Sequence, residues 1–172
     1  MTLVFEERGN SELLTPLAAV AVCEVLSSIG ADPKIKWVND IFINGKKVCG
    51  ILAERTINNS NSYITLGIGL NITTQHFPVE LKAAGSININ CDKEYIADKI
   101  SDKILDYYQD DSEIINKYRQ LLFVIGKEVT YFKNNIEFKG FAADINENCN
   151  LIIKLPDGST DILSSGEISI RI

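Results

Sequence analysis

The residues best suited to chemistry lie in one short stretch, "KWVNDIFINGKKVCGIL", which covers residues 36 to 52. Residues 34 to 47 hold four lysines against a single carboxylate, Asp40, although the whole chain carries a net charge of −6. A lysine ammonium is a compact positive charge that binds carboxylate or phosphate, and a carboxylate can hold a metal-bound phosphate. The pattern therefore indicates a site for a small anionic ligand. A surface hairpin with solvated lysines and an incidental glycine is the alternative, and the residues alone leave both open.

The spacing of this stretch predicts which groups share a surface. An Asn-Gly pair at positions 44 and 45 favours a tight turn between two strands. With a two-residue loop, Asp40 is expected to face Cys49, and because side chains alternate along a strand, Asp40 and Lys47 share one face. Lys46 then points to the other face and is interpreted as a solvated lysine. One ligand is thus expected to touch Asp40 and Lys47 together.

Glycines interrupt two apolar segments near this hairpin. Gly50 stands where a β-branched residue would be favoured, and Gly67 and Gly69 fall on one face of "GIGLN", which ends at Asn71. Glycine weakens a strand but lets a ligand or another backbone approach closely. Two such strands beside an Asp and a Lys predict a flat slot with polar ends.

The composition limits the class of protein. The chain has 172 residues, 45% hydrophobic and 23% charged, which is typical of a globular protein with a core and a small appended module. The acidic balance gives no support for a nucleic-acid partner, and we expect no membrane segment and no secretory signal. Four widely spaced cysteines predict reduced, buried thiols rather than a zinc site, and a cytoplasmic location.

The hydrophobic patterns predict an α+β fold with a mixed β-sheet and helices, followed by a small β module. We expect strands at 2–6, 35–37, 40–43, 47–54 and 63–72, and helices from 11 to about 30, at 93–109 and at 112–122. Residues 73–92 lack periodicity and are expected to form a surface loop. After residue 122, short alternating strands separated by turn residues predict about five strands in a partly closed barrel. The expected domains are therefore 1–124 and 125–172.

The motifs also resemble a known family. "KWVNDIFINGKKVCGIL" is similar to the K-W-P-N-D…K-x-x-G-I-L signature of biotin–protein ligases, "GIGLNI" resembles their G-I-G-I-N strand, and "GEISIRI" resembles the end of their C-terminal SH3-like module. The likeness runs through the whole chain in order. It implies a class II synthetase-like biotin/lipoate ligase catalytic domain, incomplete at its N-terminal side, and a small SH3-like β-barrel.

The resemblance implies ATP-dependent attachment of biotin, through biotinyl-5′-AMP, to a lysine of the biotin carboxyl carrier protein of a carboxylase. ATP, biotin and Mg²⁺ would be the ligands. Lys47 would be the catalytic residue, holding the biotin carboxylate and stabilising negative charge as ATP is attacked. Gly50 and Ile51 would line the biotin slot through their main chain.

The same resemblance assigns the nucleotide end of the site. Lys36, Asn39, Asp40, Asn71 and Arg171 would contact ATP or the adenylate. Mg²⁺ would arrive with ATP and lie near Asp40, with no protein metal site of its own.

The chain also departs from the family pattern. Val38 replaces the signature proline, and the glycine- and arginine-rich loop that precedes "TLVFEE" in the family is not in this sequence. We therefore expect a truncated chain with a bare strand edge at residues 2–6, a possible homodimer, and no DNA-binding domain. If the chain is a monomer, residues 73–92 are expected to cover that edge. Two alternatives stay open: a catalytically inactive binding or scaffold fragment, and a lipoate- or octanoate-handling relative.

Overall fold

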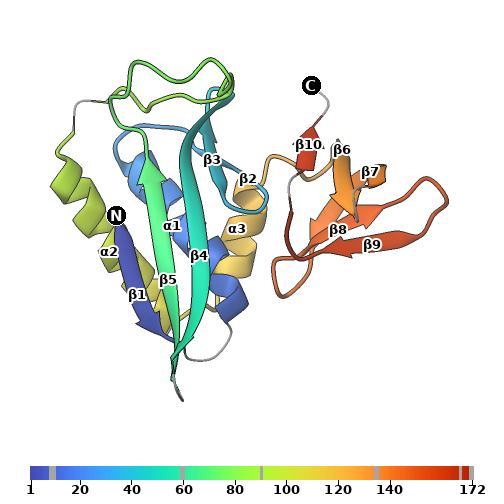
Figure 1. Ribbon diagram of the computed structural model, residues 1–172, viewed down its shortest axis with the longest axis horizontal. Helices are drawn as coiled ribbons and strands as arrows, with labels where there is room; N and C mark the ends of the chain where they lie inside the picture. Colours follow the sequence, from blue (N-terminus) through green and yellow to red (C-terminus); the bar gives the residue numbers. More distant parts are fainter. Residues whose placement is uncertain (8–10, 59–60, 90, 134–135, 167, 171–172) are drawn as a thin grey trace.

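The computed structural model describes all residues except 8–10, 59–60, 90, 134–135, 167 and 171–172. An antiparallel five-stranded sheet, ordered β1-β5-β4-β3-β2, packs against helices on one face (Figure 1). Its strands are β1 (Thr2–Glu6), β2 (Lys34–Lys36), β3 (Asp40–Ile43), β4 (Lys46–Asn58) and β5 (Asn61–Leu70). The helices are the short 3₁₀ turn η1 (Ser11–Leu13), α1 (Leu14–Ser28), α2 (Lys93–Gln109) and α3 (Ile114–Leu121). The α+β prediction is confirmed.

A second antiparallel sheet follows α3 and lies to one side of the first (Figure 1). It is ordered β10-β6-β7-β8-β9, and its strands are β6 (Glu128–Lys133), β7 (Ile136–Ile145), β8 (Leu151–Lys154), β9 (Thr160–Leu163) and β10 (Ile168–Ile170). The five predicted strands are therefore present. Among the described residues, no pairing between β9 and β10 closes this sheet into a barrel.

Helix α1 is the centre of the core. Most of its circumference is buried, and it packs against α2, α3 and the first sheet. No membrane segment is expected from the sequence, but Ser11–Ser28 is long and apolar enough for a membrane span by length and composition alone, with a mean hydropathy of 1.3 over 18 residues. Of that window, 67% is buried inside the protein, which accounts for its apolar character.

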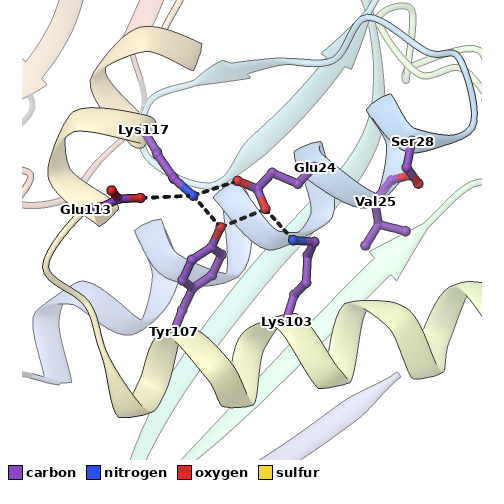
Figure 2. Close-up of polar contacts among 7 residues, drawn as sticks. All are labelled: Glu24, Val25, Ser28, Lys103, Tyr107, Glu113 and Lys117. Atoms are coloured by element: carbon purple, nitrogen blue, oxygen red, sulfur yellow. Dashed lines mark hydrogen bonds and ion pairs between the residues drawn. The ribbon is translucent and has the colours of Figure 1, made fainter.

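A polar cluster joins the three helices (Figure 2). The Glu24 carboxylate of α1 accepts hydrogen bonds from Lys103 and Tyr107 of α2, both at 2.7 Å, and from Lys117 of α3 at 3.1 Å. Lys117 also donates to the Tyr107 hydroxyl at 2.8 Å. Burial alone would raise the pKa of Glu24, but these hydrogen bonds outweigh it and lower that pKa. The cluster therefore fixes α2 and α3 to the core helix.

Two contacts join the β module to the first sheet and to α3, and a third fixes the segment that leads into the module. Ile35 of β2 forms a parallel bridge with Leu122, just after α3. The Trp37 indole N–H donates to the carbonyl of Cys149 at 2.9 Å, and Arg119 of α3 forms an ion pair with Asp144 of β7 at 2.7 Å. Hydrophobic residues of both parts belong to one continuous core cluster.

The segment between β5 and α2 is largely exposed, as expected of a surface loop, but it is fixed to one strand. It crosses the ends of β4 and β5 (Figure 1) and is hydrogen-bonded to the start of β4. The amide of Lys47 donates to the carbonyl of Ala83 at 2.7 Å, and the amide of Gly85 donates to the carbonyl of Lys47 at 2.9 Å. These bonds place the segment at β4 rather than over β1. In the described part of the chain, β1 pairs only with β5, and Val4 is 66% exposed.

Candidate functional site

Four residues on neighbouring strands form a row across the first sheet. Lys36 of β2 is opposite Asp40 of β3, Asp40 is opposite Gly50 of β4, and Gly50 is opposite Gly69 of β5. The apolar residues on either side of this row, such as Ile41 and Ile51, are buried against the helices. The row therefore lies on the sheet face that the helices leave open.

A β-bulge in β4 creates this row and corrects the expected register. Asn44 and Gly45 have φ angles of 50° and 72°, as a tight hairpin turn requires, and Phe42 is opposite Lys47 as predicted. The register then shifts, so that Cys49 is opposite Ile41 and Gly50 is opposite Asp40. The predicted Asp40–Cys49 pairing is wrong because a bulge inserts one residue and reverses the alternation beyond it.

Lys47 lies over the gap that Gly50 leaves. Its ammonium is paired with the Asp40 carboxylate at 2.5 Å, which confirms that the two side chains share a surface. A Cβ atom built on Gly50 would lie 3.4 Å from Cε and 3.5 Å from Nζ of Lys47. Because the side chains of Lys47 and Asp40 are 42% and 21% exposed, the pair stays accessible to a ligand.

The Trp37–Asn39 turn joins β2 to β3 and is held by hydrogen bonds at Val38 and at Asn39. The Trp37–Val38 peptide bond is cis. The carbonyl of Val38 accepts a hydrogen bond from the Tyr118 hydroxyl at 2.7 Å. The Asn39 amide donates to the carbonyl of Ile51 at 2.6 Å, and the amide of Ile51 donates to the carbonyl of Asn39 at 3.1 Å. Asn39 thus continues the β3–β4 pairing and fixes the main chain beside Gly50.

A hollow of about 670 Å³ lies between the first sheet and the β module. We call it the module-side hollow. Lys36, Asp40 and Lys47 line it from the sheet, together with the exposed Leu52. The β module contributes residues 148–150 and 164–166 to the opposite wall. Leu52 and the module residues were not predicted, although Leu52 follows Gly50 by two positions and alternation could have indicated it.

A second hollow of about 570 Å³ lies on the other side of Lys47, and we call it the loop-side hollow. Gly50, Gly69 and Asn71 line its floor, and residues 80–84 form one wall. The Asn71 amide donates to the carbonyl of Gly85 at 3.1 Å, so this side chain also supports the wall. The predicted slot with a glycine floor and polar ends is therefore present as two hollows that share Lys47.

The two hollows suit an elongated ligand with a negative centre. A ligand whose anionic group meets Lys47 could extend along Leu52 in the module-side hollow and along Gly50, Gly69 and Asn71 in the loop-side hollow. Cys49 lines the loop-side hollow, but burial, with a contribution from Asp40, raises the pKa of its thiol to about 12. It is therefore a protonated thiol rather than a nucleophile, and the site can act through positioning and charge.

The predicted site residues fall into three groups. Lys36, Asp40, Lys47 and Gly50 meet on the open sheet face. Ile51 is only 2% exposed, so it reaches this region through its main chain, while Asn39 and Asn71 support neighbouring backbone. Arg171 lies outside the described residues.

Two family models match this sequence. Residues 2–71 match the biotin/lipoate A/B protein ligase family, and residues 124–171 match the biotin protein ligase C-terminal domain. The first match spans both glycine-containing strands and the Lys47–Asp40 pair, and the second spans the β module.

Similar proteins are found among curated sequences. The bifunctional ligase/repressor BirA of Bacillus spizizenii is 47% identical over 73 residues, which are 40% of this chain and 22% of that protein. Its namesake from Salmonella typhimurium is 26% identical over 170 residues, or 92% of this chain and 53% of that protein. The chain thus spans about half or less of the length of these relatives.

Solved structures share the fold. The apo structure of biotin protein ligase from Aquifex aeolicus superposes with a TM-score of 0.81 and 22% identity, over 99% of this chain and 81% of that one. The Aquifex aeolicus ligase in complex with biotin and ATP superposes with a TM-score of 0.79 and 22% identity, over 99% of this chain and 76% of that one.

Proposed function

Because this chain belongs to the biotin protein ligase family, we propose that it takes part in the ATP-dependent attachment of biotin to a lysine of a biotin carboxyl carrier protein. The observation that carries the proposal is the pair of hollows that meet at Lys47. They suit a ligand with a ring system at each end and a negatively charged centre, which is the shape of biotinyl-5′-AMP. The relative that was solved with biotin and ATP has the same fold.

The proposed reaction has two steps. A carboxylate oxygen of biotin attacks the α-phosphorus of ATP, the bond to the β-phosphate oxygen breaks, and pyrophosphate leaves. The carrier lysine amine then attacks the carbonyl carbon of biotinyl-AMP, loses a proton, and AMP leaves. In the first step Lys47 brings together two anions, the carboxylate and the phosphate, and stabilises the charge that develops between them.

The remaining site residues receive roles from their positions. Gly50 and the main chain of Ile51 would form the floor of the biotin end beside Lys47, and Asn71 would place the nucleotide end in the loop-side hollow. Lys36 would attract phosphates toward Lys47. Asp40 would hold Mg²⁺ that arrives bound to ATP, because Mg²⁺ in nucleotide sites commonly takes one carboxylate together with phosphate oxygens. That ion would supply neutralisation of phosphate charge.

Lys47→Ala tests the proposal, with Lys34→Ala as a matched control. Lys34 is a half-exposed lysine on β2, paired with Asp32 at 3.1 Å. Biotin and ATP are added to each protein, and biotinyl-AMP and pyrophosphate are quantified. We expect Lys47→Ala to lower the rate of adenylate formation on the order of 10²- to 10³-fold, as the loss of a charge-stabilising donor does. Lys34→Ala should match the wild type.

Three outcomes separate the alternatives. Binding of biotin and ATP by the wild type without adenylate formation would favour the binding or scaffold fragment over the enzyme. Preference for lipoate or octanoate over biotin would favour the related acyl-handling function. A wild-type chain that binds none of these ligands would overturn the proposal.

We also propose the two domains 1–124 and 125–172, a location in the cytoplasm, and a homodimer through the edge of β1. In the described part of the chain β1 pairs with one strand only, and Val4 is exposed beside its outer edge, which suits pairing with another strand. Light scattering at low micromolar concentration should give the mass of two chains. A monodisperse monomer would contradict the dimer.

A further inference from the structure

The wall of the loop-side hollow is attached to the residue next to the proposed catalytic lysine. Lys46 Nζ donates to the carbonyl of Lys82 at 2.9 Å, and the main chain of Lys47 pairs with Ala83 and Gly85 on both sides of a parallel bridge. Because side chains alternate along a strand, Lys46 and Lys47 act on different surfaces. We call the contacts of Lys46 and Lys47 with residues 82–85 the clasp.

Gly85 makes the clasp possible. A Cβ atom built on Gly85 would lie 2.6 Å from Cβ and 3.2 Å from Cγ of Lys46, so a side chain at position 85 would clash with the start of β4. The φ angle of Gly85 is outside the left-handed region, so its requirement is space rather than backbone conformation. The Asn71 side chain also holds this segment in place, because its amide donates a hydrogen bond to the carbonyl of Gly85.

We propose that Lys46 is a positioning residue, which holds residues 82–85 against β4 and so sets the width of the loop-side hollow. This inference rests on the proposed function, in which that hollow receives the nucleotide. Residues 80–84 face Gly69 and Asn71 across the hollow, so a clasp that opens moves the wall away from the ligand. Lys47 loses two main-chain partners at the same time, which affects the ammonium that meets the ligand.

The test compares Gly85→Ala with Lys46→Gly, Lys46→Ala and the two double variants. Gly85→Ala should open the clasp by collision. Lys46→Ala keeps the Cβ atom at the centre of the clash, so combining it with Gly85→Ala should bring no relief. Lys46→Gly removes both clashing atoms, so the double variant K46G/G85A should lose the collision but still lack the hydrogen bond to Lys82. Its amide exchange should therefore be slower than in Gly85→Ala and match that of Lys46→Ala, which should exchange faster than the wild type. Hydrogen exchange of the Lys47 and Gly85 amides reports the clasp without any ligand, and calorimetric titration with ATP and with biotin reports the hollows.

We expect Gly85→Ala to speed exchange at both amides and to weaken ATP binding about 10- to 100-fold, because a misplacement of about 1 Å can lower activity on the order of 100-fold. Biotin affinity should fall much less than ATP affinity, since Leu52 and the main chain of Ile51 line the module-side hollow, outside the clasp. A greater loss of ATP affinity than of biotin affinity would indicate that the clasp positions the wall of the loop-side hollow. General destabilisation of the protein would weaken the binding of both ligands.

The results separate the two proposals. If the wild type binds ATP and Gly85→Ala binds it equally well, the clasp inference is overturned while the proposed function stands. If the wild type binds neither ATP nor biotin, the proposed function fails, and the exchange rates still decide the clasp. If the amides of Lys47 and position 85 exchange as slowly in Gly85→Ala as in the wild type, the clasp inference is overturned in either case.

Discussion

Replacing Asn39 should affect both stability and ligand binding, because its amide supports the backbone beside Gly50. In the structure Asn39 continues the β3–β4 pairing with its side chain, at 2.6 Å from the carbonyl of Ile51. Asn39→Ala removes this donor and leaves the Ile51 carbonyl unpaired in a partly buried position. Leaving such a group unsatisfied typically destabilises a protein by about 1–3 kcal/mol. Because water can partly replace the donor, we expect about 1–2 kcal/mol.

This change in free energy can be measured by thermal unfolding. For a chain of this length, 1 kcal/mol corresponds to about 2–4 °C, so Asn39→Ala should lower Tm by about 2–8 °C. At neutral pH Asn39→Asp should destabilise the protein more than Asn39→Ala does, because a negatively charged carboxylate would face the Ile51 carbonyl. A protonated aspartic acid can donate instead, which raises its folded-state pKa. The stability deficit of Asn39→Asp should therefore shrink as the pH falls toward about 4.

The alternative role for Asn39 is direct contact with the nucleotide alone. In that case Asn39→Ala would weaken ATP binding while Tm and the pH dependence of Asn39→Asp stay as in the wild type. That combination would refute the reasoning from the hydrogen bond. A drop in Tm together with a loss of affinity for both biotin and ATP would support it.

Three further changes test the site and its supports. Gly50→Val should place methyl groups where the Lys47 side chain lies and weaken biotin and ATP binding by at least about tenfold, measured by calorimetric titration, with little change in Tm. Glu24→Gln should destabilise the protein on the order of 1 kcal/mol at neutral pH, allowing for partial exposure of the cluster. Because the folded-state pKa of Glu24 is lowered, its contribution is lost as the pH falls through that pKa, so denaturant titrations of variant and wild type should converge at a pH below this lowered pKa. Trp37→Phe should cost about 1–3 kcal/mol by leaving the buried carbonyl of Cys149 unpaired, and an unchanged denaturation midpoint would contradict that value.

Most of the first sheet could be predicted from the sequence because its signals are local. The Asn-Gly turn fixed the β3–β4 hairpin, and the glycines marked the open face at Gly50 and Gly69. The bulge after Lys47 could not be predicted, because nothing in the residue types at 48 and 49 distinguishes a bulge from continued alternation. The predicted proximity of Asp40 and Lys47 survived, because the bulge lies between Lys47 and Gly50 and the long lysine side chain still reaches Asp40.

The second wall of each hollow depended on contacts between distant segments. Residues 82–85 have no periodicity, and their position is set by main-chain hydrogen bonds to Lys47, which any residue type can make. The module-side wall depends on the Trp37–Cys149 hydrogen bond across 112 positions. Sequence patterns predict individual helices and strands well, but contacts between segments far apart in the sequence become visible only in the folded structure.

The hydrogen bond of Trp37 and the bridge between Ile35 and Leu122 also bear on how the protein melts. Since both parts contribute to one hydrophobic core, neither sheet keeps its buried surface if the other unfolds. Their unfolding should then be cooperative, with one heat-absorption peak in calorimetry instead of two. A local opening at this junction would remove one wall of the module-side hollow before either sheet is lost. Ligand affinity would then decline at temperatures below the main transition.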